Sequence, residues 1–401
     1  MTSELAGSSV LLMVGNSDAQ PQGRSLRVLH VVRPAVGGMK EHLSELCDGL
    51  RDRGHIAEIA CPRGSEVADD ARALGFAVHE VTLVGPLNPL RDVRSISEIS
   101  RIVRGGSFDL VHAHGFKAGL LGRLGAALGG CRSRVVTVHN HVMYRDDISR
   151  FTKWRYRIVE RSLARLTTRI ITVSDSLRDE LVDAYGIARN RVVTVHNGVD
   201  VSRFLEPQDP AVARESLDIE PGCLVVGTAA RFAPQKGLGY FIEAAKTVCA
   251  HRSDVVFVLG GDGPLRPNLE AAVDAAGIGD FVRMPGFIVG MPAFLAALDV
   301  FVSSSLSEGL PLTLVQVGAA ALPVVATNAG GTPEIVHDGL NGVLVPPADA
   351  PALAHAVERL LDDSALRERL GREGRRIAVT EFAPETMIRR TLDVYYQALS
   401  S

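Results

Sequence analysis

Two cationic side chains lie five residues apart near the middle of the chain, Arg231 and Lys236, in a segment that begins and ends with glycine (227–237). An arginine guanidinium binds phosphate oxygens as a planar fork, and a lysine ammonium adds a compact point charge. A loop of this length could direct both cations at one diphosphate; the alternative is a solvated loop whose charges are incidental. A second glycine-rich turn, at 260–263, would let a ligand or another backbone segment approach closely.

A carboxylate and an amide follow in the segment 303–316, which reads SSSLSEGLPLTLVQ. Glu308 is predicted to end a loop just before a helix, whose first amides, from Gly309 onward, can donate to sugar hydroxyls or to phosphate. Gln316 lies eight residues later, about two helical turns along and on roughly the same face. A carboxylate beside a sugar and an amide near a ribose are typical of a nucleotide-sugar site.

Two glycines near the start of the chain, Gly37 and Gly38, lie between a predicted strand and a predicted helix. Glycines at such a turn let backbone amides and the helix N-terminus contact a phosphate or a polar substrate, although the turn could equally be an ordinary tight connection. The dinucleotide fingerprint G-x-G-x-x-G is absent from the chain, which counts against an NAD-dependent enzyme.

Histidines form a further group of candidates in the first half of the chain. His112 and His114 end a predicted strand, where contact with an acceptor or a turn is favoured over catalysis. His30 and His42 are weaker candidates still.

Thirteen short apolar runs must position these residues. The runs are continuous rather than alternating, which is typical of parallel strands covered by helices on both faces, and the segments between most of them are long enough for crossover helices. They occupy residues 26–32, 55–61, 76–81, 108–114, 134–140, 169–174, 191–197, 223–231, 254–260, 281–286, 298–304, 322–328 and 342–347.

A polar stretch with three prolines, 199–222, interrupts the series and predicts a linker. We therefore expect an α/β protein with two doubly wound, Rossmann-like domains, whose carboxyl-edge loops face one cleft. The expected parts are a flexible leader (1–23), a first domain (24–205), a second domain (206–383) and a C-terminal helix (384–401) that could pack back on the first domain.

Composition agrees with a two-domain globular chain: 401 residues, of which 46% are hydrophobic and 22% charged. Residues 1–200 carry 27 Lys+Arg against 22 Asp+Glu, and residues 201–401 carry 16 against 24. The basic first half is therefore the candidate for anionic partners, and nothing points to nucleic acid.

Five scattered cysteines without C-x-x-C spacing indicate neither a disulfide framework nor a zinc site, so a reducing cytoplasm is expected.

The segment 145–170 combines eight Lys+Arg and three Asp+Glu with apolar residues at helical spacing. Those residues are Phe151, Trp154, Ile158 and Leu166. A basic amphipathic helix of this kind could contact an anionic membrane that holds a lipid-linked acceptor; the alternative is a domain helix with a solvated cationic face.

The order and spacing of these segments resemble the retaining glycosyltransferases of the family-4 type, which have the GT-B fold. The resemblance runs from Leu26 to the C-terminal helix. It rests on GGMKEHL near the start, TVHN (137–140), HNGVD (196–200), the Arg231 to Gly237 loop, GGDGP, SEGLPL, LPVVAT, GGTPEIV and NG-x-LVPP-x-D (341–349).

The resemblance implies roles for individual residues. Arg231 and Lys236 would neutralise the donor diphosphate, Glu308 would hold the donor sugar near its anomeric carbon, and His139 would contact the transferring sugar. These four form the implied catalytic set. The implied donor site comprises Gly37, Gly38, Arg231, Lys236, Gly261, Gly286, Phe287, Glu308, Gly309, Leu310, Pro311, Leu312 and Gln316, and the acceptor site comprises Lys40, His112, His114, His139 and Asn140.

We therefore expect a glycosyltransferase that moves a hexose or N-acetylhexosamine from a nucleotide, most plainly UDP, to a hydroxyl acceptor with retention of anomeric configuration. No Asp-x-Asp triplet occurs in the chain, so neither a metal nor another cofactor is expected. The expected location is the cytoplasm, with peripheral contact at the plasma membrane. Two alternatives stay open: a nucleotide-sugar epimerase or hydrolase on the same fold, and a non-catalytic nucleotide-sugar-binding subunit.

One position departs from the family pattern. Similar enzymes usually carry a second glutamate eight residues after the first, where this chain has Gln316. An amide can still accept a hydrogen bond from a ribose hydroxyl but loses the charge-assisted component, which is worth about 1 kcal/mol or more.

Overall fold

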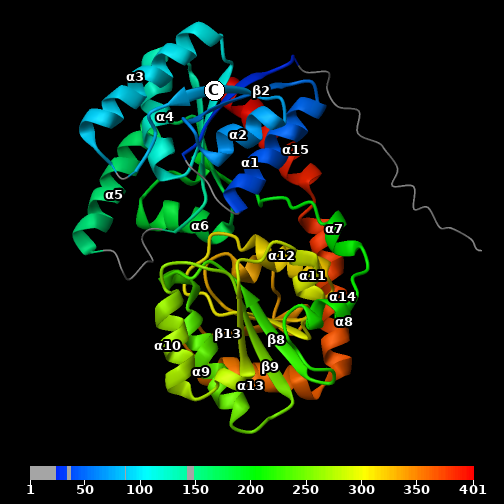
Figure 1. Cartoon of the computed structure of the whole chain (residues 1–401). Coiled ribbons are helices and arrows are strands. Elements are labelled where there is room, and N and C mark those ends of the chain that lie inside the picture. The colour runs from blue at the N-terminus through cyan, green and yellow to red at the C-terminus, as the bar shows by residue number, and fades with distance from the viewer. Residues whose placement is uncertain (1–23, 34–37, 86, 142–148) are drawn as a thin grey trace, which may run out of the picture.

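The computed structural model describes residues 24–33, 38–85, 87–141 and 149–401. They form two α/β units stacked along the long axis of the molecule (Figure 1). The predicted leader, Gly37 and the first part of the segment 145–170 lie outside the described residues.

The first sheet has seven parallel strands in the order β3-β2-β1-β4-β5-β6-β7. The continuous apolar runs predicted as strands all form strands, most of them shorter than their runs. The strands are β1 (Arg27–Val31), β2 (Ile56–Pro62), β3 (Ala77–Val81), β4 (Leu110–His114), β5 (Ser133–Val138), β6 (Arg169–Thr172) and β7 (Val192–Thr194).

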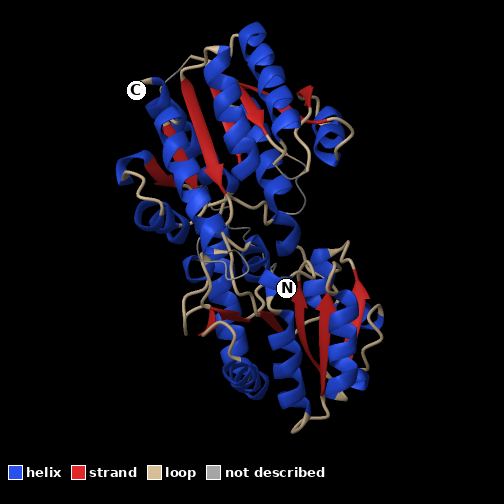
Figure 2. Ribbon diagram, turned by 90° about the vertical axis from the view of Figure 1, so that its left-hand side faces the viewer, coloured by secondary structure: helices blue, strands red, loops and turns tan. Residues whose placement is uncertain are grey.

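The second sheet has six parallel strands in the order β10-β9-β8-β11-β12-β13. Helices cover both faces of each sheet, as the buried, uninterrupted apolar strands require (Figure 2). The strands are β8 (Leu224–Ala229), β9 (Val255–Gly260), β10 (Val282–Gly286), β11 (Val300–Ser303), β12 (Val324–Thr327) and β13 (Gly342–Val345).

The helices alternate with the strands along the chain. Those of the first unit are α1 (Gly38–Asp52), α2 (Glu66–Ala73), α3 (Pro89–Gly106), α4 (Phe116–Gly129), α5 (Arg150–Leu163) and α6 (Asp175–Asp179). The remaining helices are α7 (Ser202–Leu205), α8 (Pro210–Glu215), α9 (Leu238–Cys249), α10 (Arg266–Ala276), α11 (Met291–Ala296), α12 (Leu312–Ala319), α13 (Ala350–Asp362), α14 (Ser364–Glu381) and α15 (Pro384–Leu399).

The last helix, α15, returns to the first unit, where it packs beside α1 (Figure 1). Its buried face, which includes Met387 and Tyr395, joins the hydrophobic core formed with Leu46 and Val135. The Ser133 hydroxyl also donates to the Ala398 carbonyl at 3.1 Å. The chain therefore crosses between the units twice, and the C-terminal helix belongs to the first unit.

The predicted linker is a packed segment rather than an open one. Val199, Phe204 and Ile219 are buried in a core cluster with second-unit residues such as Leu298. The same cluster also contains Val173 and Leu177 of the first unit, so this segment packs where the two units meet.

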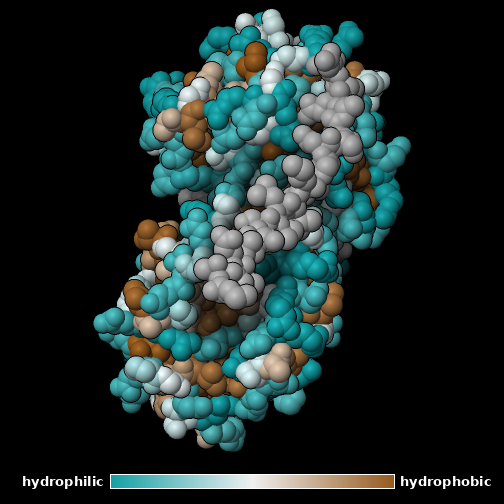
Figure 3. Space-filling view, turned by 90° about the vertical axis from the view of Figure 1, so that its right-hand side faces the viewer, coloured by the Kyte–Doolittle hydropathy of each residue, from teal (hydrophilic) through white to brown (hydrophobic). Residues whose placement is uncertain are grey.

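The surface is largely hydrophilic with scattered hydrophobic residues on the face shown in Figure 3. Within the described ranges, the structure has no helix with the length and apolar composition needed to cross a bilayer.

Several glycines of α4 are required by close packing. A Cβ at Gly125 would lie 2.7 Å from the Ile99 Cβ of α3, and a Cβ at Gly122 would lie 2.9 Å from the Ala113 Cβ of β4. These separations are well below ordinary contact, so α4 can approach its neighbours this closely only without side chains at these positions.

We expect Gly125→Ala to destabilise the first unit by about 1–3 kcal/mol, because the added methyl overpacks the α3–α4 contact. Gly105→Ala is the matched control, since outside its own helix no described atom lies within 4 Å of a Cβ at Gly105. The control should be neutral or stabilising by up to about 1 kcal/mol through helix propensity. Thermal unfolding of both variants checks this, and equal melting temperatures would contradict the packing argument.

Candidate active site

Lys236 and Glu308 form an ion pair where the carboxyl ends of neighbouring strands β8 and β11 meet. Lys236 Nζ lies 2.6 Å from Glu308 Oε1, and the Ser305 hydroxyl donates to the same oxygen at 2.6 Å. The side chains are 26% and 11% exposed, so the pair is largely shielded from water. The geometry joins two residues 72 positions apart that the sequence predicted to share one site.

The two loops that carry this pair are fastened to each other. The Leu306 amide donates to the Gln235 carbonyl at 2.8 Å, and the Ser304 hydroxyl donates to the Lys236 carbonyl at 3.1 Å. Gly237 has a φ of 58°, and a Cβ there would lie 2.2 Å from the Ser304 carbonyl oxygen. Only glycine therefore fits this turn, which brings the backbone at Lys236 against the loop that carries Glu308.

The Arg231 side chain is exposed on the same loop as Lys236, where an anionic ligand can reach it. The preceding residue is fixed by Gly261, because a Cβ at Gly261 would lie 1.9 Å from the Ala230 carbonyl oxygen. The Gly261 amide donates in turn to the Gly286 carbonyl at 2.7 Å. The predicted donor residue Phe287 follows this turn and is 79% exposed.

The residues after Glu308 bring the second unit against the first. A Cβ at Gly309 would lie 1.9 Å from the His139 carbonyl oxygen, and a Cβ at Gly38 would lie 3.1 Å from the Leu312 Cδ1. The N-termini of α1 and α12 thus meet at one point, and the first amides of each helix have no acceptor within their own helix. This contact places His139 and Gly38 beside the Glu308 loop.

The predicted donor residues of α12 and its approach differ in what they can offer a ligand. Leu310, Pro311 and Leu312 are buried, so their side chains serve packing and their backbone is the part available to a donor. Gln316 is 8% exposed, two turns into α12.

Glu334, from the segment GGTPEIV, closes the interface between the units, and sequence reasoning gave it no role. Its carboxylate accepts from the Asp175 and Ser176 amides at the start of α6, at 2.7 and 3.0 Å. It also lies 2.8 Å from His196 Nε2. A carboxylate at a helix N-terminus is stabilised by the exposed amides and the helix dipole. The GGTPEIV motif was visible in the sequence, but its partner, 159 residues away, was not.

The predicted acceptor residues are divided by the structure. Asn140 is exposed, and His139 is 8% exposed behind it. Lys40 forms an ion pair with Asp70 of α2. Lys40 and Asp70 line a cavity of about 760 Å³ between α1 and α2. Phe287 of the second unit also borders this cavity. This cavity is separate from the Lys236–Glu308 pair, which borders a much smaller cavity of about 20 Å³.

The structure does not place His112 where it could contact an acceptor. Its ring is fully buried, with Nδ1 2.6 Å from the Tyr395 hydroxyl and Nε2 2.6 Å from the Thr137 Oγ1. His114 is also buried, at 1% exposed, and its Nε2 lies 3.1 Å from His30 Nδ1. His112 and His114 are two residues apart on β4, so both rings point to the same face of the sheet, which α1 and α15 cover. They are therefore interior residues rather than cleft residues.

Comparisons with known proteins agree with this geometry. The model of the family described as Glycosyltransferase Family 4 matches residues 36–203, and that of Glycosyl transferases group 1 matches residues 211–377. The D-inositol 3-phosphate glycosyltransferase of Streptomyces avermitilis is 30% identical over 315 residues, covering 74% of this chain and 67% of that protein.

Two further relatives extend over more of the chain. The Escherichia coli UDP-Gal:alpha-D-GlcNAc-diphosphoundecaprenol alpha-1,3-galactosyltransferase is 26% identical over 346 residues, covering 85% of this chain and 89% of that protein. The crystal structure of Anabaena HepE in complex with UDP-glucose matches with a TM-score of 0.80 at 21% identity, covering 92% of this chain and 99% of that chain.

Two α/β units, each built on a parallel sheet, with the Lys236–Glu308 pair at the edge of the second sheet, match the GT-B fold of the solved glycosyltransferase. The chain belongs to the family-4 glycosyltransferases, and it is a glycosyltransferase.

We expect Glu334→Ala to separate the two units. The variant loses an acceptor for two helix amides and His196, and each hydrogen bond to a charged group contributes about 1.5–3 kcal/mol. Small-angle X-ray scattering should show a larger radius of gyration, and kcat/KM should fall tenfold or more, since each tenfold corresponds to about 1.4 kcal/mol. The control is Glu368→Ala, whose carboxylate is 74% exposed. An unchanged radius of gyration for Glu334→Ala would contradict the role of this contact.

Proposed function

We propose that this glycosyltransferase moves a hexose or N-acetylhexosamine from a UDP-linked donor to a hydroxyl of a lipid-linked saccharide, with retention of anomeric configuration and without a bound metal. The observation that carries the proposal is the shielded Lys236–Glu308 pair at the edge of the second sheet, facing His139 of the first unit. The acceptor class draws support from the Escherichia coli relative, whose name specifies a UDP-linked donor and a diphosphoundecaprenol acceptor.

Each group has a task in this transfer. The bond between the anomeric carbon and the donor β-phosphate oxygen breaks, and Lys236 and Arg231 stabilise the charge that develops on the departing diphosphate. The amides at the start of α12 add partial positive charge at the same place. Glu308 orients the sugar, and His139 contacts it from the opposite unit.

The acceptor hydroxyl attacks from the face that the diphosphate leaves. A new bond forms between its oxygen and the anomeric carbon, and its proton passes to the departing phosphate oxygen. No enzyme nucleophile is needed for retention in this scheme. Contact between the units, through Gly309 and Glu334, excludes water that would otherwise hydrolyse the donor.

The decisive variant is Lys236→Ala. We expect kcat/KM for the donor to fall by about 10²–10³, the loss typical when one preorganised group for developing charge is removed. Lys246→Ala, an exposed lysine of α9, is the matched control. The activity of both variants is measured as the release of UDP from a panel of UDP-sugars, with and without a lipid-linked saccharide acceptor. Turnover within a few-fold of wild type would overturn the diphosphate role, and full-rate turnover without acceptor would favour an epimerase or hydrolase.

Peripheral membrane contact at the cytoplasmic face is the second part of the proposal. On α5, Phe151, Trp154 and Ile158 are 65%, 55% and 44% exposed, and the rings of Phe151 and Trp154 stack at 5.8 Å. The opposite face of α5 is anchored by Glu160, which pairs with the buried Arg123 at 2.8 Å. The exposed apolar stripe is flanked by basic residues, a combination suited to an anionic lipid surface.

Trp154 reports on this contact directly, because it is the only tryptophan of the chain. We expect its emission to shift to shorter wavelength when vesicles containing phosphatidylglycerol are added, and to stay unchanged with neutral phosphatidylcholine vesicles. Phe151→Ser should weaken vesicle flotation at least fivefold, whereas Leu90→Ser, at an 86% exposed position of α3, should not. An unshifted emission with anionic vesicles would rule out docking through α5.

A further inference from the structure

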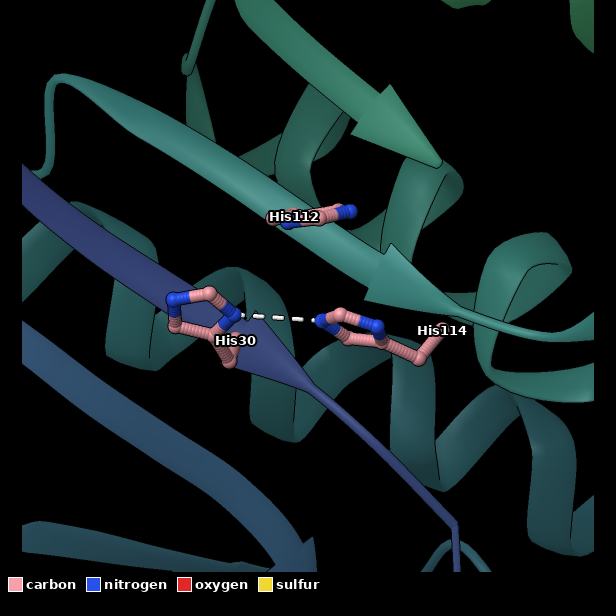
Figure 4. Close-up of side chains that lie close together, drawn as sticks. All are labelled: His30, His112 and His114. Carbon is pink, nitrogen blue, oxygen red and sulfur yellow. Dashed lines mark hydrogen bonds between the residues drawn. The ribbon is translucent and has the colours of Figure 1, made fainter. Parts of the chain in front are cut away.

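Five histidines from separate segments converge in the interior of the first unit. His30 lies on β1, His42 on α1, His112 and His114 on β4, and His139 directly after β5. Because β1, β4 and β5 are neighbours in the sheet, their carboxyl ends bring the rings together. Figure 4 shows how His30, His112 and His114 lie against each other across two adjacent strands.

Three of these rings form a compact group next to the Glu308 loop. His42, His114 and His139 each offer a ring nitrogen that lies within 4.8 Å of the nitrogens offered by the other two. The rings are 3%, 1% and 8% exposed. The group lies immediately behind the contact between the His139 carbonyl and Gly309.

Four ring nitrogens of this group lack hydrogen-bond partners among the described residues. Among the residues that the structure describes, no partner is found for His114 Nδ1, His139 Nε2 or either ring nitrogen of His42. A buried polar atom without a partner costs about 1–3 kcal/mol, and native structures contain few of them. Four such atoms in one place therefore point to a ligand that satisfies them.

The second group of candidate nitrogens, from His30, His112 and His114, is less suited to a ligand. Both nitrogens of His112 are already engaged, with Tyr395 and Thr137. His30 instead serves the first group. When its Nδ1 accepts from His114 Nε2 at 3.1 Å, the remaining nitrogen of His114, Nδ1, carries a lone pair. Metal-binding histidines are commonly held by a hydrogen bond of this kind to the other ring nitrogen.

The chemistry of imidazole indicates the class of ion that these nitrogens could hold. Burial disfavours the charged form of all three rings and so lowers their pKa values. Neutral imidazole is a good ligand for Zn²⁺, Co²⁺ and Ni²⁺ and a poor one for Mg²⁺ or Ca²⁺.

We propose that His42, His114 and His139 form a binding site for a transition-metal dication of the Zn²⁺ class, and that an ion bound there inhibits sugar transfer. Zn–N bonds of about 2.0–2.1 Å place tetrahedral ligands about 3.3 Å apart, a separation inside the 4.8 Å limit that the three nitrogens meet. The fourth position is left to water or an anion. Inhibition rests on the proposed function, since the ion would withdraw the His139 ring from the donor sugar.

Binding is tested without any transfer reaction. The metal-free full chain is titrated with Co²⁺, whose visible ligand-field absorption reports nitrogen coordination. We expect saturation at one ion per chain, and at least a tenfold weaker affinity for His42→Gln and for His114→Asn. His251→Gln, at an exposed position of the second unit, is the control and should bind as wild type does. Thermal unfolding in chelator shows whether each variant is folded, and Zn²⁺ should raise the melting temperature of wild type but not of His42→Gln.

Inhibition is tested separately, as the ratio of transfer rates with Zn²⁺ and with chelator within each variant. Zn²⁺ should lower the transfer rate of wild type and of His251→Gln at least tenfold. It should lower the transfer rate of His42→Gln less than twofold. A wild type without saturable Co²⁺ binding, or a folded His42→Gln that binds as tightly as wild type, would overturn the site. Binding of the ion without inhibition would overturn only the link to His139. A chain that binds Co²⁺ but transfers no sugar would support the metal site and contradict the proposed function.

Discussion

The approach of one backbone segment to another, at Gly309 and His139, is the constraint on which the site depends. The separation leaves no room for a side chain at Gly309, so the Glu308 loop and the end of β5 meet through backbone alone. Glu334 holds the same interface from a second point, by accepting from the first amides of α6. Together these contacts hold the helix N-termini of both units beside the Glu308 loop, an arrangement that neither unit contains alone.

The interior of the first unit is organised by a different physical rule. Polar side chains buried in a parallel sheet must be paired or neutral, and the histidines at the strand ends satisfy this requirement unequally. His112 is fully engaged with Tyr395 and Thr137, and so ties the C-terminal helix to the sheet. His42, His114 and His139 are buried with nitrogens to spare. His139 therefore belongs to a connected group of rings that extends to His42 on α1 and, through His114, to His30 on β1.

Much of the fold was predictable from local pattern. Continuous β-branched runs such as 134–140 and 254–260 became strands, because burial on both faces leaves no alternating polar residues to obscure the signal. The meeting of Lys236 and Glu308 was predictable for a similar reason: each residue follows a strand, and parallel strands present their carboxyl ends at one edge. The surroundings of the strand-end histidines were predicted less well. His112 follows the same rule of position, yet Tyr395, 283 residues away, covers it.

The sequence by itself determined the two-unit α/β architecture, the family and the cation–carboxylate pair, since each depends on spacing within a short segment or on the order of such segments. Only the tertiary structure decided which histidines are interior, that the segment 199–222 is packed, and that Glu334 joins the two units. These features depend on contacts between residues far apart in the sequence, and no local pattern specifies which distant residue will fill a given space.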